Sequence, residues 1–148
     1  MTNYRPDGFH TVTPALVVKG AKDALAHYES ALGAVTGDVM EKDGIVIHAE
    51  FKIGDSWLFI NDDAEWMPRR PMAGTQPTGL FLYVEDCDAA MKRALDAGME
   101  EFFPLQDQFW GDRTGAVKDR YGYCWTFATK KEDLSPEEIE ERAKAQGW

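Results

Sequence analysis

Hydrophobic and polar positions follow the same order twice along the chain, first in residues 16–33 and again in residues 82–98. Each copy consists of a short apolar strand, a turn, a helix and a glycine that ends the helix. The matching positions are Asp23, Ala24 and Gly33 in the first copy and Asp88, Ala89 and Gly98 in the second. The repeat predicts an architecture of two matching halves, which indicates where a ligand would bind.

The remaining elements of the first half are predicted from alternation and turn residues. Thr11 to Val18 is expected to be the first strand, with Pro14 at an edge position or a bulge. The helix is expected from about Ala21 to Leu32. Residues 44–53 alternate strictly, with Ile45, Ile47, Ala49, Phe51 and Ile53 on one face and Val46, His48, Glu50 and Lys52 on the other. Gly54-Asp55 then marks a hairpin before a strand from Ser56 to Asn61.

The second half has the same kind of pattern. After its strand and helix, strands are expected around residues 100–104, 114–118 and 123–129, with a loop over residues 106–113. Each half therefore has the order βαβββ. Module one is expected at about residues 9–62, a flexible linker at about 62–78 and module two at about 79–130. A helix is predicted at about 135–146, because Ser135, Pro136 and Glu138 form a capping-box pattern.

Composition and charge narrow the possible functions. The 148 residues are 44% hydrophobic and 28% charged, which is typical of one globular domain, and the net charge is −10. Such an acidic chain is not expected to bind nucleic acid, because phosphate would be repelled. No apolar run is long enough to span a membrane, and the beginning of the chain has no signal segment. Two cysteines, Cys87 and Cys124, are expected to be free thiols, and the expected location is cytoplasmic.

Several stretches of the chain resemble the vicinal-oxygen-chelate superfamily, which includes glyoxalase I, bleomycin-resistance proteins and extradiol dioxygenases, and within it the PhnB-like branch. The resemblance covers about residues 9–142. Its most specific part is the string Gln108-Phe109-Trp110-Gly111-Asp112-Arg113. Further support comes from residues 10–14, 17–21, 28–34, 48–50, 54–56, 83–86, 125–129 and 132–138.

The resemblance implies an α+β, glyoxalase-like fold, in which two βαβββ modules form an open, barrel-like curved sheet around a cavity. It also implies where the metal ligands of the superfamily would lie, and in this chain those positions hold Thr13, Gly79 and Thr126. Threonine and glycine are poor ligands for Zn²⁺, Ni²⁺, Mn²⁺ or Fe²⁺, which prefer imidazole or carboxylate. The usual metal site is therefore expected to be absent, and no cofactor is predicted.

His48 and Glu50 are the candidate catalytic residues. They lie two apart on a predicted strand, so their side chains project to one face and could share a proton or a ligand. A carboxylate next to a neutral imidazole raises its basicity and fixes its tautomer. The alternative interpretation is a polar sheet face that forms hydrogen bonds across strands or at a dimer interface.

The candidate ligand-binding residues are aromatic, with one cation. Trp110 and Phe109 could line an apolar pocket and Arg113 could hold an anionic ligand, although an Asp112–Arg113 pair that braces the loop explains the same residues. Alternation is expected to place a further set on the cavity side of their strands, and simple filling of the barrel is the alternative for it: Tyr83, Phe81, Tyr123 and Thr126. Cys124 is expected to be an inert thiol.

Three hypotheses follow. The first is a glyoxalase/bleomycin-resistance-like, PhnB-like protein that binds a small organic ligand, lacks the usual metal and works as a homodimer. The second is a metal-dependent lyase, isomerase or dioxygenase that uses a divalent metal ion near His48 and Glu50. The third is cofactor-free acid–base catalysis by the same pair. Whether the protein is an enzyme is left open by the sequence.

Overall fold

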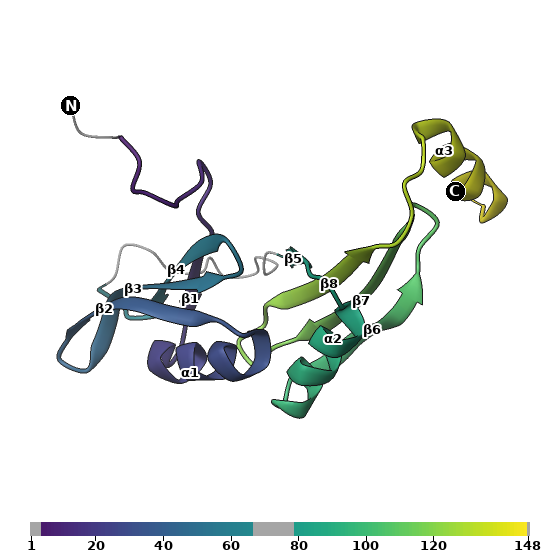
Figure 1. Ribbon diagram of the computed structural model, residues 1–148. Coiled ribbons are helices and arrows are strands. Elements are labelled where there is room, and N and C mark those ends of the chain that lie inside the picture. The colour runs from purple at the N-terminus through teal and green to yellow at the C-terminus, as the bar shows by residue number, and fades with distance from the viewer. Residues whose placement is uncertain (1–3, 67–78, 148) are drawn as a thin grey trace. The chain divides into compact units, whose positions relative to one another are not determined.

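The computed structural model describes residues 4–66 and 79–147 and divides the chain into two units, Met1–Gln76 and Pro77–Trp148. Each unit has its own four-stranded sheet and is described by itself (Figure 1). The elements of unit 1 are β1 (Ala15–Val18), α1 (Ala21–Leu32), β2 (Val35–Lys42), β3 (Ile45–Ile53) and β4 (Ser56–Asp62). Its sheet has the order β1-β4-β3-β2, in which β1 runs parallel to β4 and the other pairs are antiparallel.

Unit 2 repeats this topology. Its elements are β5 (Gly79–Tyr83), α2 (Cys87–Asp96), β6 (Glu100–Asp107), β7 (Asp112–Lys118), β8 (Cys124–Lys130) and α3 (Pro136–Ala145). The sheet order is β5-β8-β7-β6, again with one parallel pair, β5 and β8. The predicted α+β class with two βαβββ modules is therefore confirmed.

In each unit one helix packs on one face of the sheet and leaves the other face open (Figure 1). In unit 1 the ring of Tyr28 on α1 stacks on Phe51 of β3 at 5.6 Å between centroids, and both side chains are fully buried. In unit 2 Trp125 and Phe127 of β8 are buried beneath α2. Burying a large apolar side chain contributes about 1.5–3 kcal/mol, so the helix-covered face holds the core of each unit.

The helix limits follow from their capping residues. Gly33 ends α1 in the left-handed conformation at φ 68°, where its N–H donates to the carbonyl of Tyr28, as predicted. The capping box of α3 is also confirmed, with Ser135 and Glu138 bonded reciprocally. α3 buries none of its residues and is held to the chain before it by the ion pair of Arg142 with Glu132.

Three predicted strand limits were wrong. β1 begins at Ala15, not Thr11, because Pro14 has no N–H to donate to the sheet. In unit 2, β6 extends to Asp107 and β7 begins at Asp112, so the predicted loop over 106–113 is shorter than expected. The pattern had also not delimited β2, eight residues that are mostly exposed. The predicted flexible linker falls largely on residues 67–78, which lie outside the described part of the chain.

The predicted strict alternation of residues 44–53 was wrong at one position. The pairing with β2 passes from Met40↔His48 to Glu41↔Val46, so Ile47 is an extra residue on β3. This bulge reverses the faces beyond it. Val46 is therefore fully buried, as are Ala49 and Phe51, and does not share the exposure of His48.

Asp62, which ends β4, joins three segments of unit 1 through its buried side chain. Its Oδ1 accepts hydrogen bonds from the N–H groups of Gly20 and Ala21 at 3.0 and 2.7 Å, where α1 begins. Its Oδ2 accepts from the N–H of Val46 at 2.7 Å. The one carboxylate thus accepts from N–H groups at the start of α1, which have no partner within the helix, and from the N–H of Val46 beside the bulge of β3. Asp62 is therefore a structural part of unit 1.

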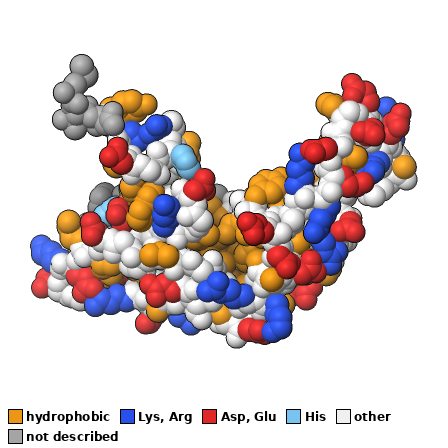
Figure 2. Space-filling model, viewed as in Figure 1, with side chains coloured by type: hydrophobic (Ala, Val, Ile, Leu, Met, Phe, Trp, Pro, Cys, Tyr) orange, Lys and Arg blue, Asp and Glu red, His pale blue; other side chains and the backbone are white. Residues whose placement is uncertain are grey.

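The visible surface mixes acidic and basic side chains with hydrophobic patches (Figure 2). Within residues 4–66 and 79–147, no helix combines the length and apolar character needed to cross a membrane.

Candidate functional site

The open face of the unit 1 sheet carries the two candidate catalytic residues among aromatic rings. His48 and Glu50 lie two apart beyond the bulge, so both side chains project from the face that α1 does not cover. The ring of His48 meets Phe59 edge-on at 4.8 Å, and Glu50 is paired with Phe59 across β3 and β4. No hydrogen bond joins the described side chains of His48 and Glu50. A shared proton between them stays a prediction.

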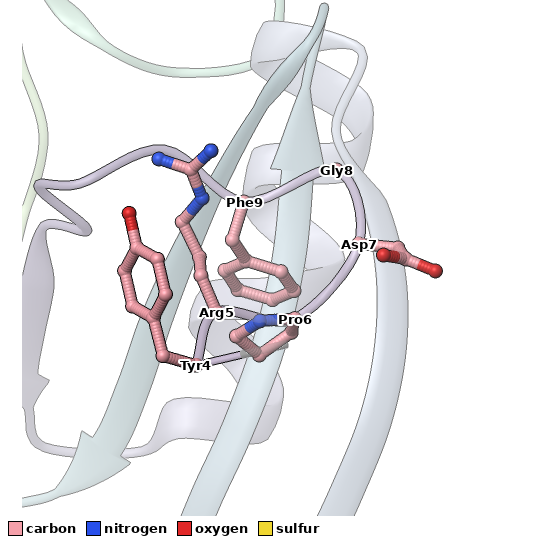
Figure 3. A pocket seen from close by; sticks show the side chains of 6 residues that line it. All are labelled: Tyr4, Arg5, Pro6, Asp7, Gly8 and Phe9. Carbon is pink, nitrogen blue, oxygen red and sulfur yellow. The ribbon is translucent and has the colours of Figure 1, made fainter. Parts of the chain in front are cut away.

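The segment before β1 packs on this same face. Phe9 stacks on Trp57 at 5.2 Å with the rings 9° from parallel, and lies 5.7 Å from Phe59. The segment from Tyr4 to Phe9 surrounds a shallow hollow with its own side chains (Figure 3). None of the predicted site residues lines this hollow, so it is not the pocket that the sequence predicted.

The open face of the unit 2 sheet carries most of the candidate ligand-binding residues. The cross-strand row Phe81, Thr126, Ala116 and Phe103 runs across all four strands, and Tyr83, Ala128 and Thr114 lie in the next row. Phe81, Tyr83 and Phe103 are 53%, 68% and 59% exposed. Thr126 is half-buried between them. Phe81 and Tyr83 lie 5.4 Å apart between ring centroids on the edge strand β5, and Phe103 lies on β6 at the opposite edge. Exposed rings on an open sheet face form an apolar surface that a flat molecule can contact.

A buried carboxylate closes one end of this aromatic surface. Asp112, the first residue of β7, is 5% exposed, and its Oδ2 accepts hydrogen bonds from the Tyr83 hydroxyl at 2.8 Å and the Trp110 indole N–H at 3.1 Å. The hydrogen bond to the Asp112 carboxylate raises the pKa of Tyr83, because the carboxylate stabilises the protonated phenol. Phe109 packs edge-on against Trp110 at 5.0 Å. The arrangement fixes the two rings that flank the carboxylate.

The loop that carries Trp110 is held by Gly111. Its carbonyl accepts hydrogen bonds from the N–H groups of Lys131 and Glu132 at 2.9 and 3.1 Å. Gly111 has φ 100°, and a Cβ at this position would lie 2.9 Å from the carbonyl oxygen of Glu132. Only glycine meets both the conformation and the close approach.

Sequence reasoning missed Asp112 as a site residue. It treated the side chain as a partner of Arg113 in a loop, whereas the two residues lie consecutively on β7 and project to opposite faces. The signal that could have found it is the spacing of Asp112 and Thr114, which places both on the face of Thr126 once the strand is extended to residue 112.

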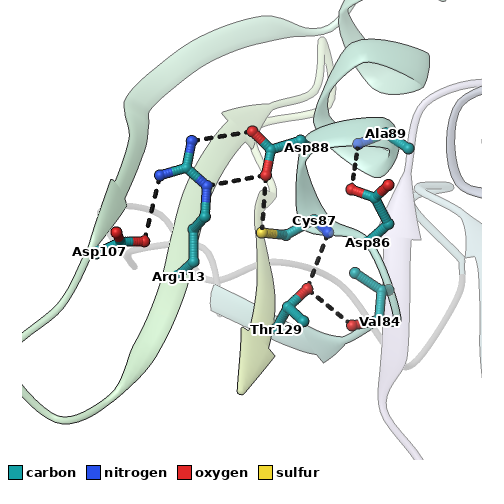
Figure 4. A network of polar contacts seen from close by, with 8 residues as sticks. All are labelled: Val84, Asp86, Cys87, Asp88, Ala89, Asp107, Arg113 and Thr129. Atoms are coloured by element: carbon teal, nitrogen blue, oxygen red, sulfur yellow. Dashed lines mark hydrogen bonds and ion pairs between the residues drawn. The ribbon is translucent and has the colours of Figure 1, made fainter. Parts of the chain in front are cut away.

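Arg113 lies on the helix-covered side and not on the aromatic surface (Figure 4). Its guanidinium donates two hydrogen bonds of 2.9 Å to the carboxylate of Asp88 on α2, and a third of 3.3 Å to Asp107 on β6. The Arg113 guanidinium lowers the pKa of Asp88, and the two carboxylates raise the pKa of Arg113. The alternative interpretation, an Asp112–Arg113 pair, is therefore wrong, because Arg113 joins α2 to the sheet through Asp88 and Asp107. The predicted role of Arg113 in holding an anionic ligand stays a prediction.

The same network holds the start of α2 (Figure 4). The hydroxyl of Thr129 accepts from the N–H of Cys87 at 2.9 Å and donates to the carbonyl of Val84 at 2.9 Å. Asp86 caps the helix by accepting from the N–H of Ala89 at 3.0 Å. In unit 1, Asp62 pairs with Val18, the last residue of β1. In unit 2, Thr129 lies one residue beyond the last pair of the register, Tyr83 with Ala128. Asp62 and Thr129 thus lie at matching ends of the parallel strand pairs and each holds the start of a helix.

Two further predicted residues lie near the start of β8. Tyr123 immediately precedes the strand, so alternation within β8 does not place its side chain, and its role in ligand binding stays a prediction. Its N–H donates to Asp119, a buried carboxylate that also accepts from the indole N–H of Trp125 at 2.9 Å. Burial raises the pKa of the Cys124 thiol, which favours the inert form.

The residues at the superfamily's metal positions do not fit a transition metal. Gly79 offers no side chain, and Thr13 and Thr126 offer neutral hydroxyls where imidazole or carboxylate is required. Within the described residues, no three histidine, cysteine, aspartate or glutamate side chains are grouped to hold a metal ion. The expectation that the protein has no metal cofactor stays a prediction.

Comparison with known proteins agrees with the topology. An uncharacterized protein of Mycobacterium bovis is 36% identical over 143 residues, which cover 92% of this chain and 93% of the relative. TioX from Micromonospora sp. ML1 has the same fold, with a TM-score of 0.67 at 21% identity over 85% of this chain and 100% of its own. A Bacillus cereus PhnB protein has a TM-score of 0.61 at 17% identity over 81% of this chain and 99% of its own.

The match to a family covers most of the chain, residues 8–127, and includes β1 to β7 and the first four residues of β8. The resemblance that the motifs indicated is thereby confirmed at the level of the superfamily. The chain belongs to the Glyoxalase/Bleomycin resistance protein/Dioxygenase superfamily.

Proposed function

We propose that this protein binds a small, planar organic molecule on the aromatic surface of unit 2, formed by Phe81, Tyr83 and Phe103, and that it belongs to the PhnB-like branch of its superfamily. The observation that carries the proposal is the exposure of these three rings, each more than half accessible on the side of the sheet away from α2. Removing a large apolar side chain fully from water is worth about 1.5–3 kcal/mol, so a flat ligand that covers them gains binding energy.

The polar end of the surface supports the proposal. The hydroxyl of Tyr83 and the indole of Trp110 are both fixed by Asp112, so these rings have lost much of their rotamer freedom before a ligand arrives. Because these side chains are already ordered, binding does not have to immobilise them, which would cost about 0.5–1.5 kcal/mol for each side chain.

The proposal does not use the usual metal, because Thr13, Gly79 and Thr126 provide no suitable ligands. The metal-dependent lyase, isomerase or dioxygenase built on His48 and Glu50 stays an alternative prediction. A cytoplasmic, homodimeric protein is the expected working form. Native mass spectrometry combined with metal analysis reports metal, bound ligand and oligomeric state together, and one tightly held transition metal per chain would favour the alternative.

Calorimetric titration with acridine, which is planar and neutral at pH 8, tests the proposal directly. Phe81→Ala and Phe103→Ala should each weaken binding about fivefold to tenfold, from the lost stacking of about 1–1.5 kcal/mol. Leu95→Ala is the control, because Leu95 is an exposed apolar side chain on α2. Absence of saturable binding, or equal weakening by Leu95→Ala, would contradict the proposal.

A further inference from the structure

We infer that the ligand of the aromatic surface is a planar cation, and that the Asp112 carboxylate recognises its positive charge. The inference rests on the proposed function and adds the chemical class of the ligand. Asp112 was not among the residues predicted to bind a ligand. Its carboxylate accepts hydrogen bonds from both Tyr83 and Trp110.

The two oxygens of Asp112 are used unequally. Both neutral donors, the Tyr83 hydroxyl and the Trp110 indole, reach Oδ2. No donor of the described residues reaches Oδ1. None of the fully buried side-chain oxygens in the described chain lacks a hydrogen-bond partner, so Oδ1 is not completely buried, although Asp112 as a whole is only 5% exposed. An ionised carboxylate with one oxygen fixed and the other accessible can accept a further, charge-assisted hydrogen bond.

The cations near Asp112 are engaged by other carboxylates. Arg113, the next residue on β7, projects to the other face and is bonded to Asp88 and Asp107. Lys130 is paired with Asp112 in the register of β7 and β8 but forms its ion pair with Asp133. Lys130 forms no hydrogen bond with Asp112 and interacts with it only through space, so it weakens the negative electrostatic potential of the site and does not cancel it.

This combination discriminates between ligands by charge. A planar cation stacks on the aromatic surface, places its charge against the electron-rich faces of Tyr83 and Trp110, and donates an N–H to Oδ1 of Asp112. A neutral ring of the same shape gains the stacking alone. A planar anion meets the carboxylate and the −10 net charge of the chain, both of which repel it. The geometry therefore favours an amino-substituted heteroaromatic cation.

Three probes of one shape test the inference at pH 8: 9-aminoacridine, a planar cation; acridine, planar and neutral; and acridine-9-carboxylate, a planar anion. The wild-type protein should bind the cation at least about tenfold more tightly than acridine, the effect of one charge-assisted hydrogen bond, and the anion more weakly than acridine. Asp112→Asn should remove the preference for the cation, so that this variant binds 9-aminoacridine and acridine with affinities within about twofold of each other.

Asp96→Asn is the matched control, because it removes the same charge from an exposed position on α2, on the other side of the sheet. It should leave the preference for the cation unchanged. Equal binding of the cation and the neutral probe by the wild type, or equal losses in the Asp96 and Asp112 variants, would overturn the inference. So would loss of acridine binding in Asp112→Asn, which would make Asp112 a structural residue. If acridine binds and the cation preference is missing, only this inference fails; if the wild type does not bind acridine, the proposed function itself fails.

Discussion

Replacing Asp62 by asparagine should destabilise unit 1 while changing almost nothing in size. The carboxylate of Asp62 accepts three backbone hydrogen bonds, two at Oδ1 from the start of α1 and one at Oδ2 from Val46. An asparagine has one acceptor oxygen and one donor nitrogen. If its oxygen accepts from Gly20 and Ala21, its NH₂ group points at the N–H of Val46. In the reverse orientation, the NH₂ group points at the two N–H groups of Gly20 and Ala21.

The loss follows from this geometry. In the better orientation the N–H of Val46, which is fully buried, is left without an acceptor, at a cost of about 1–3 kcal/mol. Removing a negative charge from the N-terminus of α1 costs about 0.3–1 kcal/mol more. The free energy of unfolding should therefore fall by about 1.3–4 kcal/mol, against a total of about 5–15 kcal/mol for a typical domain.

Urea unfolding followed by circular dichroism at pH 7 measures the loss, and amide hydrogen exchange locates it. Exchange should accelerate at Val46, Gly20 and Ala21. Thr129→Val is the matched variant in unit 2, and it should accelerate exchange at Cys87 instead, because Thr129 serves the start of α2. A loss below about 0.5 kcal/mol for Asp62→Asn, within the range of ordinary surface substitutions, would refute the argument that Asp62 is an obligatory acceptor.

Two further predictions concern unit 2. Gly111→Ala should lower the free energy of unfolding by more than Gly98→Ala. The two glycines have similar φ values, 100° and 98°, so about 1–2 kcal/mol of conformational strain is common to both substitutions. Of the two, only a Cβ at 111 would clash, with the carbonyl of Glu132, and equal losses in urea unfolding would refute this clash. The Asp88–Arg113 pair lowers the pKa of Asp88 below its ordinary 3.8, so its stabilising effect is present above that pH and is lost as the pH falls through the lowered value. Unfolding midpoints of the wild type and Asp88→Asn should therefore differ at pH 7 and converge at low pH, whereas a constant difference would show that the ion pair is not its source.

The elements with local signals could be predicted from the sequence. α1 begins at Ala21 and ends at Leu32 as expected, because the glycine after it is the left-handed residue that stops a helix. The bulge at Ile47 was not predicted: the apolar run Ile45-Val46-Ile47 interrupts the alternation of β3, but the extra residue is identified only by the pairing with β2. A bulge is a property of two strands together, so one strand's pattern does not contain it.

The candidate site was predicted less well, for a geometric reason. Asp112 and Arg113 carry opposite charges and are adjacent, which favours a pair if the segment is a loop. Once the segment is a strand, adjacent side chains project to opposite faces and cannot pair. Because β7 was expected to begin at Thr114 and not at Asp112, Arg113 was grouped with Trp110 as a ligand-binding candidate and Asp112 was not.

The repeat explains why the scaffold persists without the superfamily's ligands at the metal positions. The matched residues Asp62 and Thr129 both hold the start of a helix, one with a carboxylate that accepts three hydrogen bonds and the other with a hydroxyl that accepts one and donates one. The two halves thus conserve a requirement of the backbone, an acceptor at the helix start, and not a particular side chain. Neither helix start depends on Thr13, Gly79 or Thr126. The residues that fold each unit are therefore separable from those that give it a chemical function, which must be argued from the side chains of its open face.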